Sequence, residues 1–200
     1  MRRKGALVLT SLCPALLMAG CMVEHHNSGN GKEDDVSIRT PLGGLDVKHD
    51  ATADSAGLPV YPGASLVKDG DHGGGANVRM GFGDWQLRVV ALKYRTSDAE
   101  AKVEAFYRAP LGQYGRVIAC RDGGPVGQPT TTAEGLDCSR EAGNGTINNI
   151  QLGDDHELEL RTGSKHHQHI VALKQTGTGT EMTLVRLDLP RGLDSGKSEQ

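Results

Sequence analysis

The sequence predicts an α+β domain in which one principal helix packs on a mostly antiparallel sheet. Two patterns support this fold class: an amphipathic helix at about 97–113 inside a strand–helix–strand unit, and a later series of short strands separated by glycine-rich turns. Short connections between successive strands are typical of an antiparallel β-meander. The 200 residues, 36% of them hydrophobic and 24% charged, suffice for one such domain with terminal appendages.

The amino terminus has the features of an export signal. Basic residues 2–4 precede an apolar run over 6–19, which is too short to span a bilayer comfortably. The run ends in LMAGC, and here the chain resembles a bacterial lipoprotein precursor, in which small residues precede a cysteine that receives a diacylglycerol thioether. Met18 departs from this pattern, because leucine usually stands three residues before the cysteine and the chain has Leu17 one place earlier.

The resemblance implies that residues 1–20 are a lipoprotein signal peptide and that Cys21 is lipidated and becomes the mature amino terminus. An ordinary secretory signal, cleaved near Ala19 or Gly20, is the alternative. In the first case the protein is anchored by its lipid to a membrane of the bacterial cell envelope and faces the periplasm.

The charge balance excludes some classes of partner. Removal of the signal takes away three of the 22 basic residues and none of the 25 acidic ones, so the mature chain carries a formal charge of −6. This charge argues against nucleic acid as a partner and against a polybasic membrane patch. The expected partners are the membrane, through the lipid, and an unidentified envelope protein or ligand; no cofactor is predicted.

Two cysteines remain for the mature domain if Cys13 leaves with the signal and Cys21 carries lipid. In an oxidising compartment Cys120 and Cys138 are expected to form a disulfide. The chain-entropy model gives about 3 kcal/mol for closing a loop of this length. Two free buried thiols are the alternative, and a zinc site is disfavoured because the pair has no CxxC partner set.

The residues before the main domain are predicted to be loosely organised. Residues 21–35 are polar and glycine-containing, which is typical of a flexible tether. Residues 36–57 contain two short alternating segments around a Pro-Leu-Gly-Gly turn, followed by linker composition, which predicts a short β-hairpin and a linker.

The main α+β domain is placed at 58–190. Two prolines and a glycine form a turn over 59–64, and strands are expected at 65–67, 77–82 and 85–94. A glycine-rich loop over 69–76 lacks the Gly-Lys-Ser/Thr of a phosphate-binding P-loop and precedes a strand pattern, so it is interpreted as a hairpin loop.

The helix signal follows directly. Ser97 and Glu100 have the spacing of a capping box. Val103, Phe106, Tyr107 and Leu111 form one apolar stripe. Pro110 lacks an amide hydrogen and is expected to kink the helix or end it near Ala109. A strand over 116–120 then completes the strand–helix–strand unit.

These segments resemble a group of uncharacterised bacterial lipoproteins that share a Pro-Val-Tyr-Pro-Gly-Ala turn, a strand, and a helix with Phe-Tyr. The matching residues are Pro59 to Ala64, Asp98, Val103, Phe106, Tyr107, Leu111 and Gly115. The shared positions are turn and packing residues, so the resemblance implies a fold and a cellular location without implying a catalytic role.

The carboxyl-terminal half begins with a long excursion over 121–145, which is rich in glycine and proline. A meander is expected from strands at 146–152, 157–161, 169–175 and 182–189. Residues 191–200 are interpreted as a disordered tail.

A histidine-rich segment is the candidate metal site. His167 and His169 lie two residues apart on a predicted strand and therefore share a face. With a third ligand such as His156 they would suit Zn²⁺, Cu²⁺ or Ni²⁺. The alternative is that these histidines are exposed polar residues near a hairpin. A nearby acidic segment at 154–159 lacks the ligand spacing of an EF-hand.

The motifs favour a non-catalytic function. The chain has no Gly-x-Ser-x-Gly elbow and no His-Glu-x-x-His. The leading hypothesis is a binding or structural module that uses the glycine-rich loop near 70–76 and the disulfide-closed loop. The alternative is a periplasmic metal-binding protein that uses the His166–His169 cluster, and a hydrolase is the third hypothesis.

Overall fold

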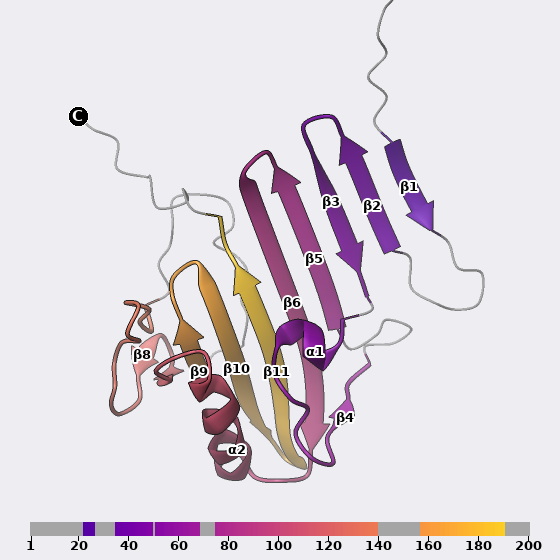
Figure 1. The fold of residues 1–200 in the computed structure, drawn as a ribbon. Helices are drawn as coiled ribbons and strands as arrows, with labels where there is room; N and C mark the ends of the chain where they lie inside the picture. Colours follow the sequence, from indigo (N-terminus) through magenta and orange to yellow (C-terminus); the bar gives the residue numbers. More distant parts are fainter. Residues whose placement is uncertain (1–21, 27–34, 50, 69–74, 140–156, 191–200) are drawn as a thin grey trace, which may run out of the picture.

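The computed structural model describes residues 22–26, 35–49, 51–68, 75–139 and 157–190. In these residues it has one 11-stranded sheet in the order β1-β2-β3-β5-β6-β11-β10-β9-β7-β8, with β4 paired to β6 (Figure 1). The pairings are antiparallel, so the prediction of a sheet-rich, mostly antiparallel fold with few helices is confirmed. The strands are β1 (Met22–His26), β2 (Asp35–Thr40), β3 (Gly43–Lys48), β4 (Ser65–Leu66), β5 (Gly75–Phe82), β6 (Trp85–Thr96), β7 (Ile118–Arg121), β8 (Gly124–Pro125), β9 (Leu158–Gly163), β10 (His167–Thr176) and β11 (Gly179–Asp188).

The amino-terminal segments belong to the same sheet as the main domain. The hairpin of β2 and β3 continues into the sheet because β3 pairs with β5. Met22–His26, which the sequence analysis assigned to a flexible tether, forms β1 and pairs with β2. An edge strand can gain order from its neighbour's backbone hydrogen bonds even where its own composition favours a linker.

Strand order in the sheet differs from strand order along the chain. β6, α2 and β7 follow one another in sequence, but β11, β10 and β9 lie between β6 and β7 in the sheet. β9, β10 and β11 are neighbours joined by antiparallel pairing. The expected strand at 146–152, the loop at 69–74 and the tail at 191–200 lie outside the described residues.

Two helices, α1 (Ala53–Ala56) and α2 (Glu100–Gly112), lie on the same face of the sheet within the described part of the chain (Figure 1). α1 packs over β6 and β11, and α2 packs over β9, β10 and β11. The core between helices and sheet includes Val90, Leu92, Leu184 and Val171, each at most 1% exposed. None of the helices in the described residues is long and apolar enough to cross a membrane.

The α1 helix was not predicted, because residues 49–57 have linker composition. A capping box nevertheless starts it: the Thr52 side chain accepts from the Ser55 amide, and the Ser55 side chain accepts from the Thr52 amide. Gly57, at φ 71°, ends it in the left-handed conformation that glycine adopts without steric cost. Local capping and burial of Ala56 therefore outweigh the weak propensity of this short segment.

The amino-terminal end of α2 differs from the prediction. The helix starts at Glu100 after Ala99, which makes no side-chain capping bond, so the predicted Ser97–Glu100 capping box is wrong. The Glu100 amide instead donates to the side chain of Gln175 on β10, at 3.3 Å. Asp98 accepts from the hydroxyl of Tyr61 and from Lys102, and these contacts hold the chain in its approach to the helix.

The α2 stripe has Tyr107 at its centre. Val103, Tyr107 and Leu111 are fully buried, whereas Phe106 is only half-buried and packs edge-on against Tyr61 and Tyr107. Of the two expected effects of Pro110, the early end near Ala109 is wrong, since the helix continues to Gly112; a kink at Pro110 stays a prediction. Burial of Leu111 keeps the last turn helical, where the missing amide of Pro110 removes only one hydrogen bond.

Candidate functional site

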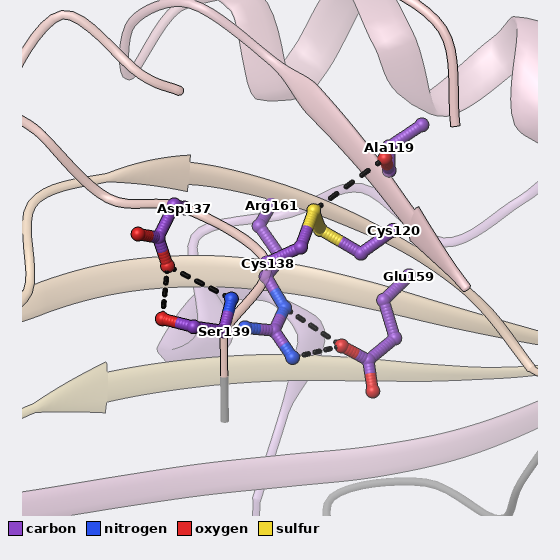
Figure 2. Close-up of polar contacts among 7 residues, drawn as sticks. All are labelled: Ala119, Cys120, Asp137, Cys138, Ser139, Glu159 and Arg161. Carbon is purple, nitrogen blue, oxygen red and sulfur yellow. Dashed lines mark hydrogen bonds and ion pairs between the residues drawn. A yellow bond between two sulfur atoms is a disulfide. The ribbon is translucent and has the colours of Figure 1, made fainter. Parts of the chain in front are cut away.

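The predicted disulfide is present between Cys120 on β7 and Cys138, with their Cα atoms 5.5 Å apart (Figure 2). Both cysteines are buried and form a small apolar cluster with Ile118. The loop that the disulfide closes also contacts β9, because the hydroxyl of Thr132 donates to the carbonyl of Gly163 at 2.7 Å. The loop also contributes β8, which pairs with β7, and a bridge from Gly135 to Ser164, so several contacts hold it to the sheet.

The polar groups beside the disulfide pair with one another. Arg161 donates through Nε to the carboxylate of Glu159 at 2.7 Å, and both side chains are almost buried (Figure 2). Asp137 accepts from the amide and hydroxyl of Ser139, and these hydrogen bonds lower the pKa of its carboxyl group. Because the polar groups of these side chains form hydrogen bonds with one another, this cluster is better suited to holding the loop than to binding a ligand.

The predicted metal-site residues are only partly brought together. His167 and His169 share one face of β10, and His167 Nδ1 lies 3.2 Å from a carboxylate oxygen of Asp188. His169 stacks on the ring of Tyr114, with ring centres 3.7 Å apart. No group of three histidine, cysteine or acidic side chains in the described residues is arranged to hold a metal ion. His156 and Cys21 lie outside those residues, so the metal site and the lipidation site stay predictions.

His169 lies at the border between the core and the open part of the sheet. Burial lowers its pKa, and the nearby charge of Arg186 lowers it further, whereas Asp188 raises it. The Tyr114 hydroxyl donates to the carbonyl of Gly57 at 2.6 Å. The end of α1 is therefore attached to the turn after α2 directly above this histidine.

Beyond the helices, the helix-bearing face continues as a polar surface. A row of side chains, each directly opposite the next in the strand register, crosses it from β2 to β10. We call these residues the polar row: Ser37, Asp46, Arg79, Arg88, Asp188 and His167.

Three arginines meet at the middle of this surface. Arg79 on β5 and Arg88 on β6 are directly opposite each other, and Arg186 on β11 lies diagonally from Arg88 because it is opposite Val90. We call Arg79, Arg88 and Arg186 the arginine cluster. Burial lowers the pKa of Arg88, and the charges of Arg186 and Arg79 lower it further, while Asp188 raises it.

Among the described residues, the charge of the cluster is incompletely neutralised. Asp188 accepts from Nε of Arg186 at 3.0 Å. Arg88 contacts the carbonyl of Ser55 through Nη2 at 3.4 Å, and its buried Nε has no hydrogen-bond partner in the part of the chain that the structure describes. The buried Oδ1 of Asn77, two residues from Arg79 on the same face, also lacks a partner among these residues. Buried polar groups without partners are rare in folded proteins, so their position beside three cations marks this surface as the candidate site.

Sequence reasoning missed this cluster. Period-two alternation does place Asn77 and Arg79 on one face of their strand. The signal that was lacking is the pairing register, which alone brings Arg79, Arg88 and Arg186 together from β5, β6 and β11. The glycine-rich loop near 70–76, which the leading hypothesis used, lies outside the described residues except for Gly75 and Ala76 on β5.

Comparison with models of protein families, with curated proteins and with solved structures finds no match to this chain.

Proposed function

We propose that this chain is a lipid-anchored, non-catalytic binding module of the bacterial cell envelope. Its binding surface is the polar row together with Arg186, on the part of the helix-bearing face that the helices leave open. The observation that carries this proposal is the direct opposition of Arg79 and Arg88.

The opposition of two arginines is unfavourable for folding. Like charges directly opposite each other in an antiparallel pair destabilise the sheet, whereas opposite charges or apolar pairs stabilise it. Residues that are unfavourable for the local structure are expected mainly at functional sites. We therefore assign the two arginines to recognition of a ligand that supplies the missing negative charge.

The proposed anchor fits the position of β1. Cys21 directly precedes β1, so a lipid on this cysteine would attach beside the edge strand of the sheet. The acyl chains would hold the protein at the membrane through the hydrophobic effect, at about 0.8 kcal/mol per buried CH₂ group. The folded domain would then lie close to the membrane surface and face the periplasm.

Amide resonances of the isotope-labelled full chain test the binding surface. We expect an extract of soluble envelope components to shift resonances at 77–81, 86–90 and 184–188. Resonances at 118–125, beside the disulfide, should be unaffected and serve as the internal control. Shifts confined to the loop at 121–139, or no shifts with any extract, would contradict the proposal.

Metal binding is the second candidate function. The approach of His167 to Asp188 supports it, because a carboxylate that accepts from one ring nitrogen commonly orients a histidine ligand. Titration with Zn²⁺ and with Cu²⁺ tests it. Stoichiometric heat of metal binding that disappears in His167→Gln would favour metal binding over binding of an anionic ligand. Absence of heat with both metals would exclude metal binding as a function.

A further inference from the structure

We infer that the arginine cluster binds a phosphate-class oxyanion, either as a free phosphate group or as the phosphate of a larger molecule. This inference rests on the proposed function, since it assigns a ligand class to the same surface. It is carried by the strand register that places the three arginines together and by the polar atoms beside them that have no partner among the described residues.

The spacing of the cluster suits a single oxyanion. Neighbouring strands lie about 4.8 Å apart, so Arg79 and Arg88 emerge side by side from β5 and β6. Arg186 emerges diagonally from Arg88, at a backbone separation of about 7–8 Å. Long arginine side chains starting at these three points can converge on one group. A guanidinium presents paired donors that match the oxygens of phosphate.

The charges of the site favour an anion. The three arginines and Asp188 sum to +2, on a mature chain whose formal charge is −6. Asp188 is already engaged by Arg186 and lies beside His167, so it offsets only part of the positive charge. Asp46, opposite Arg79, accepts from the Ser37 hydroxyl at 2.7 Å and from Arg39 at 3.5 Å. An incoming phosphate would offset the remaining charge.

The unpaired atoms narrow the choice of oxyanion. Nε of Arg88 is a buried donor that needs an acceptor. Oδ1 of Asn77, a residue only 7% exposed, is a buried acceptor that needs a donor. Hydrogen phosphate offers both, because it carries acceptor oxygens and keeps a hydroxyl at neutral pH, and a phosphate monoester offers both in its monoanionic form. Sulfate offers acceptors only, so we expect it to bind more weakly than phosphate.

Calorimetric titration of the full chain in detergent tests the inference. The probes are inorganic phosphate, sulfate at the same ionic strength, and dihexanoyl phosphatidic acid. We expect binding of phosphate, and a loss of affinity of about tenfold or more in Arg88→Gln and in Arg79→Gln, since each removes a hydrogen bond to a charged group. Arg95→Gln is the matched control, because Arg95 lies on β6 but points to the opposite face. Melting temperatures of all variants confirm that they fold.

The outcomes separate this inference from the proposed function. Phosphate binding that depends on Arg79 and Arg88 but not on Arg95 supports the inference. Binding of phosphatidic acid as well as phosphate would assign the ligand to a lipid headgroup, and binding of phosphate alone would assign it to a soluble compound. Equal affinity for sulfate and phosphate, or equal loss in Arg95→Gln, overturns the phosphate assignment. If the phosphate assignment is overturned but the amide resonances still shift with an envelope extract, the proposed binding surface is retained and its ligand is of another class.

Discussion

Replacement of Tyr107 by alanine should be among the most destabilising single substitutions in α2. The Tyr107 ring is fully buried and stacks edge-on with Phe106, with ring centres 5.0 Å apart. Its hydroxyl donates to the carbonyl of Pro59 at 3.2 Å and lies 3.6 Å from the sulfur of Met182. Removal of a buried aromatic side chain costs about 3–5 kcal/mol, a large part of a typical domain stability of about 5–15 kcal/mol.

Two companion variants separate the contributions of ring and hydroxyl. Phe106→Ala should cost about half as much, roughly 1.5–2.5 kcal/mol, because the Phe106 ring is only half-buried. Tyr107→Phe keeps the ring and removes one hydrogen bond, so it should cost about 0.5–1.5 kcal/mol. Equilibrium unfolding in urea under oxidising conditions gives the three free energies, with unchanged m-values as the check on two-state behaviour. A larger cost for Phe106→Ala than for Tyr107→Ala would refute this account of the core.

Three further predictions concern the anchor, the disulfide and His169. Cys21→Ser should abolish incorporation of a clickable fatty acid, and label retained on the variant would disprove lipidation at Cys21. Replacing both Cys120 and Cys138 by alanine should lower the free energy of unfolding by about 3 kcal/mol in urea titrations, because the unfolded chain is freed from an 18-residue constraint; an unchanged midpoint would contradict this. Because burial lowers the pKa of His169, its imidazole binds a proton more readily in the unfolded state than in the folded state. The free energy of unfolding should therefore keep its full value above about pH 6.5 and decrease below it. The stability of His169→Phe should decline less over the same pH range, and an identical decline would argue against this assignment.

The sequence predicted the sheet-rich fold class because the relevant signals are local. Alternation marked β6 and the later strands, and glycine-containing turns separated them. Alternation also placed Trp85, Leu87 and Val89 on one face of β6, and they do share a face. The helices, however, cover the other face, where Val90, Leu92 and Tyr94 are in the core. A strand that is apolar on both faces does not indicate which face the helices cover.

The errors arise where tertiary contacts replace local signals. The α2 helix starts after Ala99 because Gln175, far away in sequence, bonds its first amide, and no local pattern reveals that contact. The α1 helix is too short for hydrophobic periodicity to indicate it. The arginine cluster depends on the register between β5, β6 and β11, which turn lengths and packing decide together. Local patterns thus limit the fold class, while the candidate site depends on pairings between distant segments.

Arg79 and Arg88 are placed opposite each other for ligand binding, and their mutual repulsion lowers the stability of the fold. A double-mutant cycle of Arg79→Gln and Arg88→Gln, followed by urea unfolding at low ionic strength without phosphate, measures their interaction directly. We expect each single substitution to relieve the same repulsion. The coupling free energy should be about 0.2–1 kcal/mol, with the sign that means the two arginines destabilise each other, and it should decrease with added salt. A coupling of the opposite sign, in which the two arginines stabilise the folded protein together, would contradict the claim.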